Sequence, residues 1–246
     1  YGGLAVIERG LKAGEVVDKT IAALLPLLSP GDLLIDGGNE FYKNTERRSA
    51  ELVAKGFRVI RFDNRDVGLS QRFDHLGVPN IAAGAVKHTL GMAVASPYRL
   101  ADLADDTAAL IDALGLQSAH VCGASMGGMV AQHLAARHPQ RVRSLTLMMT
   151  TSGARRLPQP GWKVRMALMS RPENARDLDS VIEHFVRLYG VIGSPGYPPE
   201  PATLRERLAM SVKRSYRPAA TARQLMAIVA DGDRTPMLAQ VRQPTQ

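Results

Sequence analysis

The sequence predicts an α/β protein with three layers, a mostly parallel sheet and a helical cap. Strand-like and helix-like segments alternate in the first part of the chain, an order typical of a parallel sheet. A serine flanked by glycines, in the segment 123–128 (GASMGG), lies between a short strand pattern and a helical pattern. The segment from about 157 to 229 is helical and follows the predicted sheet, as expected of a cap.

The first predicted elements run helix, strand, helix, strand. Pro30 and Gly31 end the first helix, whose apolar residues recur at helical spacing: Val17, Ile21, Leu24, Leu25 and Leu28. A short buried strand follows at 32–36 and stops at a Gly-Gly pair. The second helix is capped by Asn44 or Thr45 and ends at Gly56, and the next strand covers 58–62.

The length and composition fit one large soluble α/β domain, or one domain with an added fragment. The chain has 246 residues, of which 45% are hydrophobic and 22% charged. The most apolar stretch, 21–35, is too broken by Pro26, Pro30 and Asp32 to span a membrane. The start has no signal-peptide pattern, and the single Cys122 suits a reducing compartment. We therefore expect a cytoplasmic protein without a membrane partner.

The net charge of +8 does not predict nucleic-acid binding. The basic residues are scattered, with no run of five or more Lys or Arg. Aromatic residues, which single-strand binders interleave with basic ones, are only 5% of the chain. We expect the net positive charge to be spread over a basic solvated surface. Separately, we expect no metal and no cofactor.

The segment around Ser125 has the pattern of a nucleophile elbow. A strand at 119–122 enters the turn and a helix at 129–137 leaves it. A sharp strand-to-helix turn needs small neighbours, which the chain supplies at Gly123, Ala124, Gly127 and Gly128. Such a turn exposes the serine hydroxyl and directs the helix N-terminus at a developing oxyanion, with Met126 N–H as one donor. The alternative interpretation is a glycine-rich turn with an idle serine.

The segment KAGEVVDKTIAALLPLLSPGDLLIDGGNEFYKNTERR resembles the cofactor-binding domain of 6-phosphogluconate dehydrogenase. In that family the KAG turn and the Asn of IDGGN line the cofactor and substrate site, which implies Lys12, Ala13, Gly14 and Asn39 here. The chain has no G-x-G-x-x-G to cradle a pyrophosphate, and the family's SGG segment and catalytic lysine-bearing domain are missing. These positions are therefore interpreted as vestigial, and an NADP-dependent dehydrogenase fragment is the least favoured function.

From about residue 57 onward the chain resembles an α/β-hydrolase of the aclacinomycin methylesterase-like esterase branch. The resemblance is carried by several motifs in the family's order: RVIRFDNRDVGLS at 58–70, VCGASMGG at 121–128, HPQRVRSLTLMMTTSG at 138–153, IGSPGYP and GDRTPML. It implies Ser125 as the nucleophile of a carboxylic-ester hydrolase. It also implies that the segment 157–229 is a cap that shapes a pocket for a small apolar ester.

The remaining triad members are expected to be absent. The family order is Ser, then Asp or Glu, then His. His133 and His138 lie too far along the helix after the elbow, and His184 lies in the predicted cap, so each is interpreted as a surface or packing residue. His120 is expected to point into the sheet.

The resemblance places the acid and base after the last two strands, and Asp231 and Asp233 precede that point. The chain stops at RQPTQ, where the next strand should begin, so we expect a C-terminally truncated protein with at most weak activity.

A second oxyanion donor is predicted in the dehydrogenase-like segment. We hypothesise that 33–36 takes the place of the hydrolase's third strand, which would bring Gly38 N–H near the oxyanion position. The hypothesis requires Leu34 to lie within one strand of Val59. The alternative is a surface βα turn unrelated to Ser125.

Four regions are therefore expected: a dehydrogenase-like Rossmann fragment at 1–56, a hydrolase core at 57–156, the cap at 157–229, and at 230–246 the start of the remaining core. The methionines and Trp162 of the cap suit either an apolar site or ordinary packing. Arg65, in the DNRD loop, is interpreted as a hydrogen-bond hub rather than a substrate clamp.

The leading functional hypothesis is an esterase with an incomplete triad. The main alternative is a non-catalytic chimera, joined near 52–57, that binds small apolar ligands. An incomplete sheet would also expose unpaired edge groups, so self-association through that edge is expected.

Overall fold

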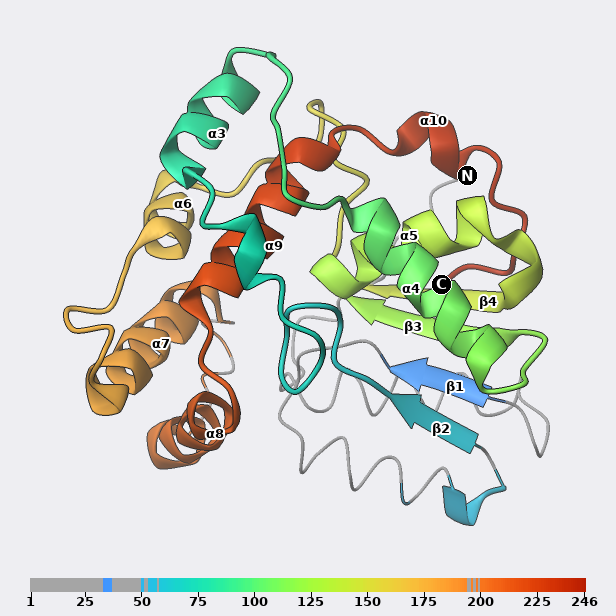
Figure 1. Ribbon diagram of the computed structural model, residues 1–246, viewed down its shortest axis with the longest axis horizontal. Helices are drawn as coiled ribbons and strands as arrows, with labels where there is room; N and C mark the ends of the chain where they lie inside the picture. The colour runs from blue at the N-terminus through green and yellow to red at the C-terminus, as the bar shows by residue number, and fades with distance from the viewer. Residues whose placement is uncertain are drawn as a thin grey trace.

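The computed structural model describes residues 33–36, 50, 53–56, 58–193, 196, 198 and 200–246. The helices predicted near 17–28 and 44–56 lie wholly or mostly outside the described residues. The fold can be followed without them from the strand at 33–36 onward (Figure 1).

The described strands form one parallel sheet in the order β2-β1-β3-β4. Its strands are β1 (Leu33–Asp36), β2 (Arg58–Arg61), β3 (Ala119–Ala124) and β4 (Val142–Met148). Leu34 lies opposite Val59 of β2 on one side and His120 of β3 on the other. The predicted adjacency of Leu34 and Val59 is confirmed, and β1 sits directly beside the strand that leads to Ser125.

The sheet continues beyond β4 through the last residues of the chain. Leu145 N–H donates to Pro244 O (2.8 Å), and Gln246 N–H donates to Leu145 O (3.0 Å). Thr245 forms a parallel bridge with Leu145. Residues 244–246 thus run alongside β4, where the sequence predicts the start of the next strand.

Two long helices cover one face of the sheet: α4 (Leu100–Ala113) and α5 (Met126–Arg137) (Figure 1). They pack on each other, and α5 packs on β3 and β4. Large buried apolar side chains of this region come from the two helices and the strands: Leu100, Leu103, Ile111, Leu134, Val121 and Leu145. Their burial, worth about 1.5–3 kcal/mol for each large side chain, stabilises the platform that carries Ser125.

The remaining helices gather on the side of the molecule to which the strand arrowheads of β1, β2 and β3 point (Figure 1). They are α3 (Ile81–Thr89), α6 (Trp162–Met169), α7 (Leu178–Ile192), α8 (Pro201–Arg214) and α9 (Pro218–Asp231). Helix α9 contacts α3 and α4, whereas α7 contacts α6 and α8. The short helices are η2 (Asp74–Leu76), η3 (Pro139–Arg141) and α10 (Thr235–Leu238). In the part of the chain that the structure describes, no helix is long and apolar enough to cross a membrane.

Side-chain caps fix the beginnings of three of these helices. Asn80 accepts a hydrogen bond from Ala83 N–H before α3, and Asp177 accepts two before α7. Glu200 does the same for α8, whose first residue is Pro201. Helix α9 begins with Pro218, whose fixed φ suits the first helical position.

Candidate active site

Ser125 lies on a strained turn between β3 and α5. Its φ of 52° and ψ of −119° are unusual for a residue with a side chain, and the residue is exposed. Its N–H donates to Met148 O at the end of β4 (2.9 Å), and its carbonyl accepts from Thr150 Oγ1 (2.8 Å). These bonds hold the turn in the conformation that presents the hydroxyl at the carboxyl edge of the sheet.

Two glycines of the turn are required by close approach. A Cβ at Gly123 would lie 2.5 Å from Gly127 O, a backbone atom. A Cβ at Gly128 would lie 2.8 Å from the Thr150 side chain. The small residues predicted around Ser125 therefore allow β3, α5 and the end of β4 to pack closely.

Met126 begins α5, so its N–H belongs to the first turn, whose donors have no acceptor within the helix. The positive end of the helix dipole adds to the attraction for a developing oxyanion. Gly38, the predicted second donor, lies outside the described residues. Asp36, the last residue of β1, is in register with Cys122 of β3, so the chain leaves β1 at the same sheet edge as Ser125.

The histidines of the core have partners other than Ser125. His138 Nε2 lies 2.7 Å from Asp105 Oδ1, and His120 Nδ1 lies 2.7 Å from Ser144 Oγ on β4. Among the described residues, no hydrogen bond joins Ser125 Oγ to a histidine. His184 belongs to α7 and is buried.

His133 is a buried packing residue and not a partner of Ser125, as the sequence predicts, but its ion pair was not predicted. It is 9% exposed, and its Nε2 lies 2.8 Å from Asp231 Oδ1 at the end of α9. Arg234 also pairs with Asp231 and donates to Gln132 Oε1 (2.8 Å). Burial raises the Asp231 pKa, but His133 and Arg234 outweigh it and hold that pKa below its usual value. This buried cluster joins α5 to the end of α9, a contact between residues 98 apart that sequence spacing does not reveal.

Arg65 in the DNRD loop has the contacts of the predicted structural hub. It donates to both carboxylate oxygens of Asp106 (2.6 and 2.7 Å) and to Asp102 O (3.2 Å). Its guanidinium also lies over the rings of Phe73 (5.2 Å) and Tyr98 (5.8 Å).

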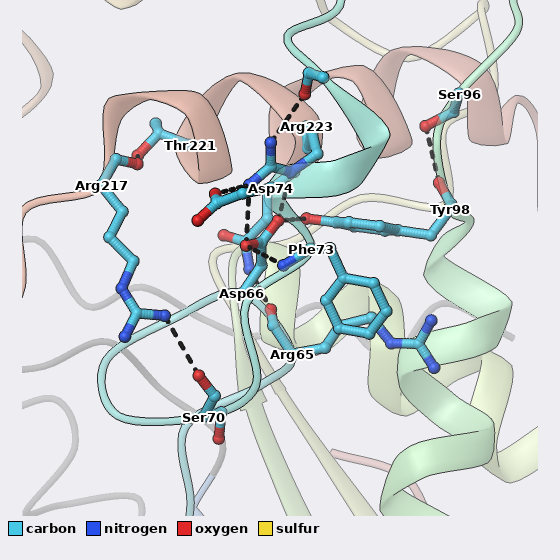
Figure 2. A network of polar contacts seen from close by, with 12 residues as sticks. Arg65, Asp66, Ser70, Phe73, Asp74, Ser96, Tyr98, Arg217, Thr221 and Arg223 are labelled. Carbon is cyan, nitrogen blue, oxygen red and sulfur yellow. Dashed lines mark hydrogen bonds and ion pairs between the residues drawn. The ribbon is translucent and has the colours of Figure 1, made fainter.

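The next residue, Asp66, forms a buried ion pair that the sequence did not indicate (Figure 2). Arg223 of α9 donates to the two carboxylate oxygens of Asp66 (2.5 and 2.9 Å). The side chain of Arg223 is 1% exposed and that of Asp66 is 0% exposed. Tyr98 Oη donates to Asp66 (3.2 Å), and Arg223 also reaches Asp74 (3.0 Å). Burial raises the Asp66 pKa, but the hydrogen bonds from Arg223 and its other partners lower this pKa by more than burial raises it. The carboxylate therefore stays ionised. Asp66 has a positive φ of 69°, which this network stabilises.

The loop after β2 also lies against residues next to the elbow. A cavity of about 20 Å³ lies among nine residues: Phe62, Asn64, Thr107, Val121, Cys122, Gly127, Val130, Ala131 and Leu134. Asn64 is 8% exposed, and its Oδ1 has no hydrogen-bond partner among the described residues. The volume suffices for one water molecule, which would satisfy this acceptor. The loop after β2 is thus linked to the elbow on one side and, through Asp66, to α9 on the other.

Comparison with protein families gives the same fold as the strand-turn-helix geometry around Ser125 indicates. The profile of the alpha/beta hydrolase fold matches residues 33–183, more than half of the chain. The chain belongs to this family. A hydrolase of known structure from Pseudomonas aeruginosa has a similar fold, with a TM-score of 0.54 and 22% identity over 89% of this chain and 71% of that one. The three-layer α/β prediction is thereby confirmed as this hydrolase fold.

Two curated relatives match different lengths of the chain. Rhodomycin D methylesterase of Streptomyces sp. (strain C5) is 36% identical over 118 residues, which are 48% of this chain and 34% of the relative. The decarboxylating 6-phosphogluconate dehydrogenase of Chlamydia pneumoniae is 56% identical over 50 residues, which are 20% of this chain and 10% of that enzyme. Both predicted resemblances are confirmed, and the matched parts span 34% and 10% of the two relatives.

The dehydrogenase-like residues Lys12, Ala13, Gly14 and Asn39 lie outside the described residues. Within the described part of the chain, no group of three or more His, Cys, Asp or Glu is arranged to hold a metal ion.

Proposed function

We propose that this α/β-hydrolase acts on carboxylic esters with Ser125 as the nucleophile. The observation that carries the proposal is the exposed serine at φ 52°, held between β3 and the N-terminus of α5. Attack of Ser125 Oγ on the ester carbonyl would form a tetrahedral intermediate, with its oxyanion near Met126 N–H. The alcohol then leaves, and water releases the carboxylic acid. The methylesterase relatives support a carboxylic ester as the substrate.

Turnover by this chain is expected to be weak. A serine hydroxyl must give up its proton to a base, and no described histidine bonds to Ser125. Without the base, catalysis is limited to oxyanion stabilisation and binding, roughly 10³–10⁴-fold over water. Gly38 N–H is proposed as the second oxyanion donor, because β1 leaves the sheet beside β3.

Labelling with a fluorophosphonate and hydrolysis of a p-nitrophenyl ester test the proposal. Ser125→Ala should abolish both signals. Ser118→Ala is the matched control, because Ser118 precedes β3 at the opposite end of the strand from Ser125. Equal labelling and hydrolysis in the wild type and Ser125→Ala would contradict the proposal and favour a fold that only binds small apolar ligands.

A chimeric origin is proposed for the chain, with a junction near 52–57. The separate match to dehydrogenases supports it. So does the position of β1, which fills a sheet place between β2 and β3 although its sequence lies in the dehydrogenase-like segment. We do not propose dehydrogenase activity for this chain. Saturable binding of NADP would contradict the interpretation of the dehydrogenase-like segment as vestigial.

A further inference from the structure

A groove in the cap contains polar groups that the esterase proposal does not use. Its volume is about 200 Å³, and it lies between α6 and α7, which pack together (Figure 1). It is lined by eight residues: Ala167, Ser170, Arg171, Glu173, His184, Arg187, Leu188 and Val191. None of them belongs to the elbow, so the groove is a separate place on the molecule.

His184 is the one buried residue of this lining, at 7% exposed. Its ring contacts Phe185 edge-on, but its nitrogens have no hydrogen-bond partner among the described residues. A neutral imidazole carries one N–H donor and one acceptor, and both nitrogens are accessible from the groove that the residue lines. An imidazole that faces a groove without a protein partner therefore indicates a place for a polar ligand atom.

The charged groups around His184 favour an anion. Arg171 and Arg187 line the groove with only one carboxylate, Glu173. The Glu173–Arg187 pair is long (3.6 Å) and exposed, so it contributes little and can open. Guanidinium groups bind carboxylates through two parallel hydrogen bonds, which makes them suited to this ligand class.

The rest of the lining favours an apolar tail. Ala167, Leu188 and Val191 present aliphatic surface beside the arginines. The volume lies below the usual 300–1,000 Å³ of drug-sized pockets, which limits the ligand to a small molecule.

We propose that this groove binds a small carboxylate with a short aliphatic tail. The carboxylate is held by Arg171 and Arg187 and accepts a hydrogen bond from His184, while the tail lies along Leu188 and Val191. This site is independent of Ser125. Such a ligand is of the same chemical class as the acid that the proposed ester hydrolysis would release.

The test is a titration of the isotope-labelled Ser125→Ala protein with hexanoate, followed by NMR of the histidine rings at about pH 7.5, where histidine is mostly neutral. Because this variant lacks the proposed nucleophile, failure of the groove and failure of the esterase proposal are distinguishable. The His184 signals, assigned with His184→Gln, should shift with saturation. Hexan-1-ol, which lacks the charge, and inorganic phosphate, which lacks the tail, should bind at least about tenfold more weakly.

Arg171→Gln combined with Arg187→Gln should weaken hexanoate binding by about tenfold or more. Both residues are exposed, so the fold should persist, as unchanged signals from the other histidines would verify. Arg205→Gln is the matched control, because Arg205 lies on α8 and pairs with Glu183 outside the groove. An unsaturable shift, equal binding of hexan-1-ol or phosphate, or unchanged binding by the double variant would each overturn the proposal.

Discussion

Helices α9 and α6 come from the same predicted cap, yet they are held in opposite ways. Helix α9 buries five residues, and its Arg223 reaches the loop after β2 through an ion pair closed to solvent (Figure 2). Helix α6 buries no residue, and Trp162, Met166 and Met169 are each at least half exposed. The cap is therefore two parts: α9, which is anchored to the core, and an outer cap of α6, α7 and α8.

The stability of this protein resides mainly in the anchored part. In α9, the anchored part, Arg223 is buried together with its partner Asp66 and the neighbouring apolar side chains. In the outer cap, only a small cluster around Val181, Ile182, Leu208 and Val212 is buried, and most ion pairs are exposed. Substitutions should therefore cost much more in the first part than in the second.

The largest effect is expected from Arg223→Met. The substitution leaves Asp66 ionised and buried without its partner, which typically costs about 3–5 kcal/mol. Urea unfolding should show this loss, and adding Asp66→Asn should recover part of it. Arg205→Met on α8, whose pair with Glu183 is about half exposed on both sides, should change the free energy of unfolding by about 0–1 kcal/mol. Equal losses in the two single variants would remove the distinction between the two parts.

The same substitution at two glycines should have opposite signs. Gly123→Ala places a Cβ 2.5 Å from Gly127 O and should destabilise the elbow by about 1–3 kcal/mol. Gly190→Ala lies in α7 with no atom within 4 Å of the new methyl group and should stabilise by up to about 1 kcal/mol, because glycine is a poor helix former. Thermal melting of the two variants checks this, and a stabilising Gly123→Ala would contradict the close packing of the turn.

The two parts should lose stability in different pH ranges. Burial and then Arg187 lower the His184 pKa, so the folded outer cap binds this proton less readily than the unfolded chain does. The contribution of neutral His184 to the free energy of unfolding is complete above the unfolded-state histidine pKa of about 6.5. It declines as the pH falls from about 6.5 towards the lowered pKa of the folded state. The lowered Asp66 pKa gives a contribution that is complete above about 3.9 and is lost only below it.

Hydrogen exchange should therefore show α7 opening at mildly acidic pH while α9 stays protected. In His184→Gln the mildly acidic step in α7 should disappear. A single transition shared by α7 and α9 would show that the parts are not separate.

The smallest effect is expected from Trp162→Ser. The indole is 72% exposed and contributes little buried area, so the free energy of unfolding should change by less than about 0.5 kcal/mol. A loss above about 2 kcal/mol would mean that α6 is held as firmly as α9.

Local pattern was sufficient for the parts of the molecule that depend on neighbouring residues. The GASMGG turn, the strand before it and the helix after it could be predicted, because small residues, strand length and helix periodicity are all local signals. Leu34 could be placed beside Val59 for a related reason: consecutive strands with a predicted helix between them usually form a parallel pair.

The fold class, the hydrolase lineage and the serine at the elbow could be read from the amino-acid sequence. Three features depend on how the chain packs: the contact of Asp66 with Arg223, the contact of His133 with Asp231, and the position of His184 at a groove. The first two contacts join residues 157 and 98 positions apart, and a buried charge has no preferred partner until the chain is packed around it. His184 fits its helical pattern as well as any packing residue would. Its unpaired nitrogens become visible only when α6 and α7 are placed together.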